Sequence, residues 1–261
     1  MYDQNVPTKL PPFDLLVEVA PIDGCFAHIP ALPGLCYRAY DPEGAMRIAQ
    51  DQIANYLKWL LEKELSDLNP KVFTLASWVN SQNFAGVRVI ERERRDGAPL
   101  WISGNPTVLF EYDHQPLDDT AVRAHLRFVC QIVKSIRAKV DVMHPDHRGR
   151  KPTPQIRSID ETLTHIGNCV WWYCSRIDNE LPEPIESADE TPMARIERLL
   201  EAAKKNLLAI PNQSRTTVHI PTRMLTKDPQ EAWTHTKVCR RQAEHMWEHL
   251  QTLDEEIGTA A

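Results

Sequence analysis

Apolar and polar residues alternate in short runs over the first 90 residues and recur with a helical period after residue 117. Alternation places successive side chains on opposite faces of a strand, which is typical of a sheet with one buried face. The Asp23-Gly24 pair between the first two runs is typical of a hairpin turn. The runs expected to form strands are 14–20, 25–29, 35–40, 71–79 and 86–90.

One helix is expected within this β-rich half. Asp41 precedes Pro42, which is a favourable pairing of a helix cap with a first helical residue. The helix is expected to end at about Leu65, and its apolar residues recur on one face. This expected buried face consists of Met46, Ala49, Ile53, Tyr56, Leu57 and Leu60. The polar, proline-containing residues 1–12 are expected to form a loosely held tail.

Four amphipathic helices are expected after residue 117. The first begins near Asp118, and the second begins after Ser158, where Glu161 completes a capping-box pattern. The fourth begins at Asp228-Pro229 and ends at about Glu256. Four such helices with connecting loops predict a four-helix bundle. The third helix is expected over 193–207, and the connecting loops over 143–157, 179–188 and 209–227.

The charge balance and the cysteine pattern exclude several classes of protein. The 261 residues carry a net charge of −6, so no overall basic field attracts nucleic acid or an anionic membrane. The first ten residues lack the apolar segment of a signal peptide, and no apolar run approaches the roughly 18 residues of a membrane span. Six cysteines without a C-x-x-C pair are typical of a reducing compartment. We therefore expect a cytoplasmic protein without nucleic-acid or membrane partners.

The histidines of the expected fourth helix indicate a metal site. His245 and His249 are four residues apart, which places both imidazoles on one face of a helix. His165 is the single histidine of the expected second helix, and it lies to one side of that helix's apolar stripe. A position beside the stripe suits a site at the seam between two helices. Three neutral imidazoles bind a divalent ion, most simply Zn²⁺ or Ni²⁺, and leave a coordination position open.

Several neighbouring residues are candidates for the same site, and each has a structural alternative. Cys169, one turn from His165, is either a fourth ligand or a buried thiol. Trp172 is either a pocket wall or a packing residue, and Arg241 either binds substrate or pairs with acidic neighbours. Glu161 and Glu248 are weak candidates for an acid or base, and the favoured interpretation of each is a solvated surface carboxylate.

The N-terminal half resembles a known family of small domains. The segment Asp23-Gly-Cys-Phe-Ala-His-Ile-Pro-Ala-Leu-Pro-Gly34 is followed by a strand and then by Asp-Pro-Glu-Gly-Ala45, which opens a helix ending Asn-Tyr-Leu-Lys-Trp-Leu60. This order is similar to HicB-like domains, which are β-β-β-α-β modules best known as antitoxins. The resemblance covers about 14–65 and implies the fold. It assigns no catalytic residue to this half.

The C-terminal half resembles a second family. Helix two contains Thr-His-Ile-Gly-Asn-Cys-Val-Trp-Trp-Tyr-Cys-Ser-Arg-Ile, and helix four contains Lys-Val-Cys-Arg-Arg-Gln-Ala-Glu-His-Met-Trp-Glu-His-Leu. Together they resemble the DinB-like superfamily, whose four-helix bundles carry one histidine on the second helix and an H-x-x-x-H pair on the fourth. The pattern falls on His165, His245 and His249. The resemblance implies hydrolase-like or low-molecular-weight-thiol transferase-like activity.

The sequence thus predicts an α+β chain with two domains. The expected parts are a tail over 1–12, a HicB-like domain over 13–90, a connection over 91–116 and a DinB-like bundle over 117–257. The leading function is that of a divalent-metal-dependent enzyme acting on a small molecule. The alternative is a non-catalytic binding or scaffold protein, in which the HicB-like domain forms a homodimer or recognises a partner and the bundle has an empty site.

Overall fold

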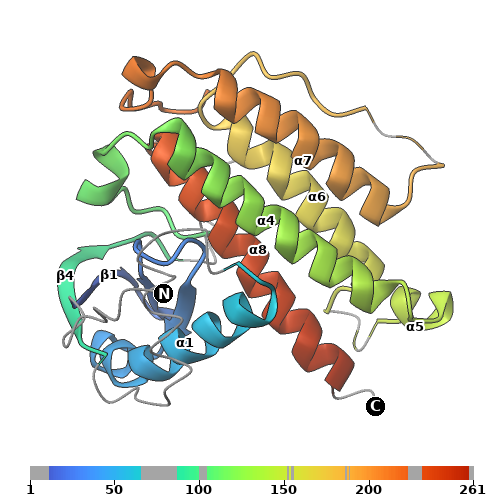
Figure 1. The fold of residues 1–261 in the computed structure, drawn as a ribbon, viewed down its shortest axis with the longest axis horizontal. Helices are drawn as coiled ribbons and strands as arrows, with labels where there is room; N and C mark the ends of the chain where they lie inside the picture. Colours follow the sequence, from blue (N-terminus) through green and yellow to red (C-terminus); the bar gives the residue numbers. More distant parts are fainter. Residues whose placement is uncertain are drawn as a thin grey trace, which may run out of the picture. The chain divides into compact units, whose positions relative to one another are not determined.

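The computed structural model describes residues 12–65, 87–99, 105–151, 153, 156–185, 187, 189–222 and 231–258, with side chains up to residue 254. The chain divides into two compact units, Met1–Phe110 and Glu111–Ala261. The first contains the sheet and one long helix, and the second contains four long helices (Figure 1). The mixed α+β class expected from the sequence is confirmed. Within the described residues, no helix has the length and apolar content needed to cross a membrane.

The first unit is built on a four-stranded sheet in the order β3-β2-β1-β4. Neighbours β1–β2 and β2–β3 are antiparallel, whereas β1 and β4 are parallel. A parallel pair requires a crossover, and α1 (Pro42–Glu62) lies between β3 and β4 in the chain. The expected strand over 71–79 lies outside the described residues. The strands are β1 (Phe13–Ala20), β2 (Gly24–His28), β3 (Cys36–Ala39) and β4 (Val89–Asp96).

The turn between β1 and β2 requires the glycine that the sequence provides. Ala20 pairs with Gly24, so the chain reverses over three residues. Gly24 has a φ of +89°, and a side chain there would collide with the carbonyl oxygen of Ala39 on β3. Only glycine meets both conditions without strain. The hairpin turn expected at Asp23-Gly24 is therefore confirmed.

Helix α1 begins and ends close to the predicted residues. The Asp41 side chain accepts a hydrogen bond of 2.5 Å from the Gly44 amide, and Pro42 occupies the first helical position. Glu64 adopts a left-handed φ of 55° and ends the helical path. The predicted apolar face is buried from Ala49 through Leu60, whereas Met46 is only half-buried.

The charge-rich run after residue 90 belongs to the sheet, which corrects the expected domain boundary. Strand β4 continues to Asp96 as an edge strand, and its side chains alternate between half-buried and exposed up to Arg94. The buried carboxylate of Glu18 then accepts hydrogen bonds from the backbone amides of Thr107 (2.6 Å) and Val108 (3.1 Å). These contacts hold the segment up to Phe110 in the first unit, whereas the sequence placed it in a connection over 91–116.

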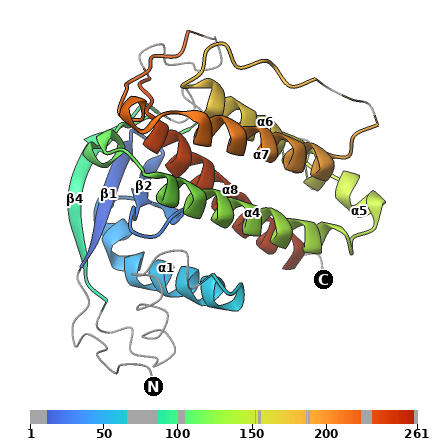
Figure 2. The ribbon, with the colours of Figure 1, turned by 45° about the horizontal axis from the view of Figure 1, so that its top comes forward.

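In the second unit, four long helices lie side by side (Figures 1 and 2). Three of them are capped by the side chain just before the first turn: Asp118, Ser158 and Thr191 each accept a backbone amide hydrogen bond. The predicted capping box of Ser158 and Glu161 is present in both directions. The long helices are α4 (Asp119–Val140), α6 (Ile159–Ser175), α7 (Pro192–Ala209) and α8 (His235–Gly258).

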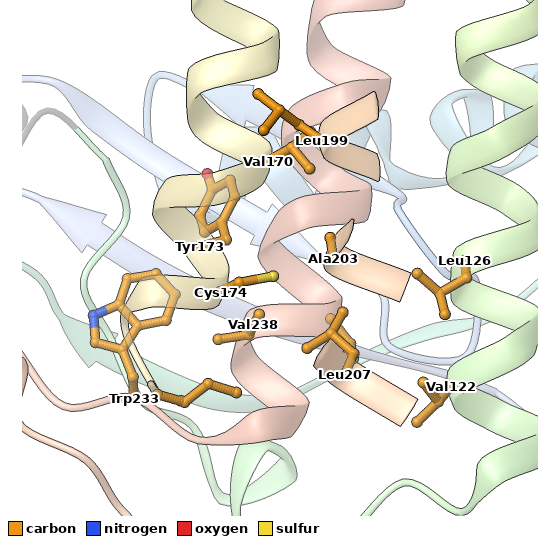
Figure 3. Close-up of a cluster of buried hydrophobic side chains, with 12 residues drawn as sticks. Val122, Leu126, Val170, Tyr173, Cys174, Leu199, Ala203, Leu207, Trp233 and Val238 are labelled. Carbon is orange, nitrogen blue, oxygen red and sulfur yellow. The ribbon is translucent and has the colours of Figure 1, made fainter. Parts of the chain in front are cut away.

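The apolar stripes of these helices meet in one core, drawn in Figure 3. Val170, Tyr173 and Cys174 extend from α6, and Val238 extends from α8 toward them. Burying such side chains stabilises the unit because it removes apolar surface from water. The cluster consists of Val122, Leu126, Val170, Tyr173, Cys174, Ile177, Leu199, Ala203, Leu207, Trp233, Val238 and Cys239.

Two expectations about this half were wrong. The fourth long helix does not extend back to Asp228-Pro229, since it begins at His235. Trp233, two residues before the helix, instead pairs with His219 in an antiparallel bridge, with N···O distances of 2.7 and 2.9 Å. The Thr234 hydroxyl caps the helix by accepting a hydrogen bond from the Lys237 amide.

The second wrong expectation is an irregular loop over 143–157. Pro145–Gly149 forms a short helix, α5, within this segment, and His144 caps it. Among the described residues of this unit, the other short helices are η2 (Glu111–His114) and η3 (Asn212–Ser214).

Candidate metal centre

The H-x-x-x-H pair of α8 forms a close contact. The Nε2 atoms of His245 and His249 lie 3.0 Å apart, and the centroids of their rings are separated by 4.3 Å. The two residues lie one turn apart on one face of the helix, as the sequence predicts. Both side chains are half-buried.

His165 of α6 completes the cluster. Its ring centroid lies 5.2 Å from that of His245 and 5.2 Å from that of His249. Each of the three residues offers a ring nitrogen, and these nitrogens all lie within 4.8 Å of one another. The three histidines singled out in the sequence therefore lie together, and we refer to His165, His245 and His249 as the histidine cluster.

Packing fixes α6 so that His165 faces this seam. Leu163, Ile166 and Val170 are buried on the core side of the helix. Gly167 faces α7, because a side chain there would lie in ordinary contact, at 3.5 Å, with the side chains of Arg195 and Ile196. His165 lies beside that buried face and is half-buried itself, which matches its predicted place beside the stripe.

The surroundings of the cluster favour neutral imidazoles. Burial, assisted by the charge of Arg157, lowers the pKa of His165 to about 4. Burial also lowers the pKa of His245 well below its ordinary value, with further lowering by His249 and His165. A neutral imidazole carries a free lone pair, which is the form that binds a metal ion. Both side chains are therefore in their ligand form at neutral pH.

The spacing of the nitrogens is compatible with a divalent ion. Two nitrogens that each bind one ion at about 2.0–2.1 Å lie about 2.9–3.4 Å apart when the N–metal–N angle is between the octahedral and the tetrahedral value. The 3.0 Å between His245 and His249 falls in that interval. The same distance is also a normal N–H to N hydrogen bond between two neutral imidazoles, so the pair is stable without an ion. The third nitrogen, on His165, lies within the 4.8 Å limit and would need a small movement.

The cluster is one end of a polar seam between α6 and α8. On α6, His165, Cys169 and Tyr173 follow one another at intervals of one turn, and Cys169 Sγ lies 3.6 Å from both ring nitrogens of His165. The Tyr173 ring lies 5.7 Å from that of His245. On α8, Arg241 lies one turn before His245, and its charge acts on the pKa of Cys169 and of Tyr173.

The Tyr173 ring belongs to the core cluster of this unit. Its proximity to His245 was missed, because sequence spacing alone gives no distance between helices. Burial raises the pKa of Tyr173 far above its ordinary value, so the phenol keeps its proton and can donate a hydrogen bond. The structure thus adds a proton donor to the candidate residues of the site.

The pocket-lining candidates have structural partners. The Trp172 ring packs edge-on against Trp233 at 5.5 Å, and the Arg176 guanidinium lies 4.6 Å above it. Arg241 is buried and forms an ion pair of 2.6 Å with Glu244 on the same helix. Burial raises the pKa of the Cys169 thiol to about 12. The contact of Cys169 with His165 nevertheless keeps that thiol at the edge of the cluster.

The two acid–base candidates differ in their surroundings. The Glu161 carboxylate belongs to the capping box, in which it accepts a hydrogen bond of 2.9 Å from the Ser158 amide. It also forms an ion pair of 2.7 Å with Lys151. Its hydrogen bond with Lys151 lowers its pKa, so it is a weaker base than an ordinary carboxylate. Glu248 is half-buried, and its charge raises the pKa of Tyr173, which places Glu248 within electrostatic reach of the seam.

A separate apolar cavity of about 230 Å³ lies between α6, α7 and the segment that connects them. The Trp171 indole closes one wall and donates a hydrogen bond of 2.8 Å to the Pro182 carbonyl. None of the candidate site residues lines this cavity. Its lining consists of Trp171, Cys174, Leu181, Pro182, Pro184, Arg198, Leu199, Ala202, Ala203 and Asn206.

Comparisons of the chain with models of known families, with curated proteins and with solved structures find no match in any of the three. The resemblances to HicB-like and DinB-like proteins therefore stay hypotheses that rest on motifs. A functional assignment depends on the residues and distances described above.

Proposed function

We propose that the second unit is a divalent-metal-dependent enzyme of the DinB-like kind, in which His165, His245 and His249 hold the ion. One observation carries the proposal. Three histidines from two helices bring their ring nitrogens within 4.8 Å of one another, in surroundings that keep at least His165 and His245 neutral. Such a set suits Zn²⁺ or Ni²⁺, which accept nitrogen ligands.

Three protein ligands favour a catalytic rather than a structural role. Structural zinc sites are usually closed by four protein ligands, whereas three leave a position for a small molecule. A bound ion would supply Lewis acidity, which activates water or stabilises a thiolate. We therefore propose a hydrolase-like or thiol transferase-like reaction on a small molecule. Tyr173 would donate a proton or hydrogen bond there, and the buried aromatic residues beside it would exclude water.

The first unit is proposed to be a HicB-like domain. The observed order β1-β2-β3-α1-β4 among the described residues supports that proposal. Our second candidate function is a binding or scaffold protein in which this domain forms a homodimer or recognises a partner. The 3.0 Å contact of His245 with His249 favours this second function, because two neutral imidazoles can form a hydrogen bond with each other without an ion.

Metal content distinguishes the two functions. Untagged protein purified without chelator is expected to contain about one divalent ion per chain by elemental analysis. His245→Ala and His249→Ala are each expected to lose it, because two ligands do not hold an ion as three do. His147→Ala is the matched control, since His147 is an exposed histidine on α5. If the protein stays metal-free after zinc and nickel are offered, the proposal of a metal-dependent enzyme is refuted.

A further inference from the structure

The apolar cavity between α6 and α7 has a buried floor and an exposed rim. Cys174, Leu199 and Ala203 form the floor, and all three are buried members of the core cluster drawn in Figure 3. Pro182 and Ala202 also line the cavity, and both are exposed. A small molecule can thus enter from solvent and contact the apolar interior of the second unit.

Hydrogen bonds fix the segment that covers this cavity. The Trp171 indole donates to the Pro182 carbonyl at 2.8 Å, and the Arg198 guanidinium donates to the Ile185 carbonyl at 3.1 Å. Pro182 and Pro184 have a fixed φ, which limits how far the segment can collapse onto the helices. The Ile185 side chain is 83% exposed, so this apolar residue does not fill the cavity. The site is therefore preformed, and a ligand would not have to order the segment.

The charges around the cavity favour a neutral ligand. Arg198 is the one charged side chain among the described residues that line it. Its guanidinium is paired with the Glu190 carboxylate, at 2.7 Å through Nε and at 2.6 Å through Nη2. An anionic or cationic group in the cavity would therefore have to break that pair or stay without a counter-ion. Either outcome is costly in apolar surroundings.

One polar group beside the cavity lacks a hydrogen-bond donor. Asn206 lines the cavity, and its side-chain nitrogen donates to the Asp178 carboxylate at 3.0 Å. Its side-chain oxygen is buried and accepts no hydrogen bond in the part of the chain that the structure describes. An acceptor of this kind costs free energy until a donor reaches it. A ligand could supply the donor after a small rotation of the Asn206 side chain, since the oxygen itself is closed to solvent.

We propose that this cavity binds a small neutral aromatic molecule that carries one hydroxyl or N–H group. Trp171, Leu181 and Pro184 supply apolar walls against which a planar ring packs. An apolar cavity of about 150 Å³ is enough to hold benzene. A volume of about 230 Å³ therefore admits two fused rings. The single donor binds the Asn206 oxygen. The histidine cluster takes no part, so the inference does not depend on a metal ion.

Three naphthalenes that share one ring system test the proposal on the full-length protein. 2-Naphthol is neutral and carries a donor, 2-methoxynaphthalene is neutral without a donor, and 2-naphthoate is charged. Equilibrium dialysis is expected to show one 2-naphthol bound per chain, with a dissociation constant on the order of 100 µM or tighter. 2-Methoxynaphthalene should bind about fivefold more weakly, because one neutral hydrogen bond is lost. 2-Naphthoate should bind at least about tenfold more weakly, because its charge is unpaired in the cavity.

Two variants locate the binding. Ala202→Trp covers the rim of the cavity and is expected to weaken 2-naphthol binding at least about tenfold, since most of the apolar contact is lost. Ala138→Trp is the matched control, because Ala138 is an exposed residue of α4 that does not line the cavity. Circular dichroism confirms that both variants are folded, as expected for changes at exposed positions.

Saturable binding that is lost in Ala202→Trp and kept in Ala138→Trp would support the site. Its absence in wild type up to the solubility limit of 2-naphthol, or equal binding by wild type and Ala202→Trp, would overturn the site. 2-Naphthoate binding as tight as that of 2-naphthol would overturn the neutral class of ligand. Equal binding of 2-naphthol and its methyl ether would overturn the role of the Asn206 oxygen. None of these results bears on the proposed metal centre, which is tested by its own metal content.

Discussion

The Nε2 atom of His249 lies 3.0 Å from the Nε2 atom of His245, one turn earlier on α8. Two protonated imidazoles would repel each other at this distance, whereas two neutral ones form an N–H to N hydrogen bond. The pKa of His245 is lowered by burial first and then by the positive charge that His249 and His165 would carry. The close pair therefore depends on neutrality, and so does metal binding, which uses the same lone pairs.

Metal binding is expected to release fewer protons than three ordinary histidines would. At pH 6, three imidazoles with the usual pKa of about 6.5 would give up about two protons together. His165, with a pKa of about 4, and His245, whose pKa is lower than usual, hold almost none at that pH. We expect less than one proton per ion, measured by calorimetry in buffers of different ionisation enthalpy. A release of two or more protons would contradict the neutral cluster.

Cys169→Ala is expected to leave metal binding intact. The thiol touches His165 at 3.6 Å, but the nitrogens that lie within 4.8 Å of one another belong to the three histidines alone. The dissociation constant for zinc, from competition with a chromophoric chelator, should change by less than about threefold. Cys174→Ala is the matched control for losing a buried thiol from the same helix. A tenfold loss in Cys169→Ala alone would make this thiol a fourth ligand.

Asp113→Ala is expected to destabilise the second unit strongly. Both oxygens of Asp113 accept from the Arg240 guanidinium, at 2.8 and 2.7 Å, and both side chains are buried. Removing Asp113 should cost about 3 kcal/mol, because the buried Arg240 guanidinium loses two hydrogen bonds and keeps a longer contact, of 3.2 Å, with Glu244. The control is Glu197→Ala, which breaks the exposed pair with Arg137 and should cost less than about 1 kcal/mol in urea unfolding. An equal loss of unfolding free energy in the two variants would contradict a stabilising role for the buried pair of Asp113 and Arg240.

Gly97→Ala is expected to destabilise the first unit. A side chain at Gly97 would collide with the carboxylate of Glu18, which holds the Thr107 and Val108 amides. Displacing that carboxylate should cost about 2 kcal/mol, through strain and lost hydrogen bonds. Gly149→Ala is the matched control, because nothing lies within 4 Å of a side chain there. If thermal unfolding shows both variants as stable as wild type, Glu18 does not hold this segment.

Local sequence determined the parts of this protein that depend on residues close together in the chain. Asp41 before Pro42, and Ser158 before Glu161, specify helix starts because capping hydrogen bonds span only three residues. The four-residue spacing of His245 and His249 places both on one face for the same reason. The α+β class followed from the change of hydrophobic period. These features needed no knowledge of which elements pack together.

Tertiary structure decided what depends on contacts between distant segments. The sequence made His165 a candidate, but only the packing of α6 beside α8 sets its 5.2 Å distance to the pair. The same packing brings the Tyr173 ring to within 5.7 Å of the His245 ring. Pairing of Trp233 with His219 moved the start of α8 away from the local signal at Asp228-Pro229. A backbone hydrogen bond to a separate segment of the chain satisfies the same N–H and C=O groups as a helical turn, so local preference alone could not choose between them.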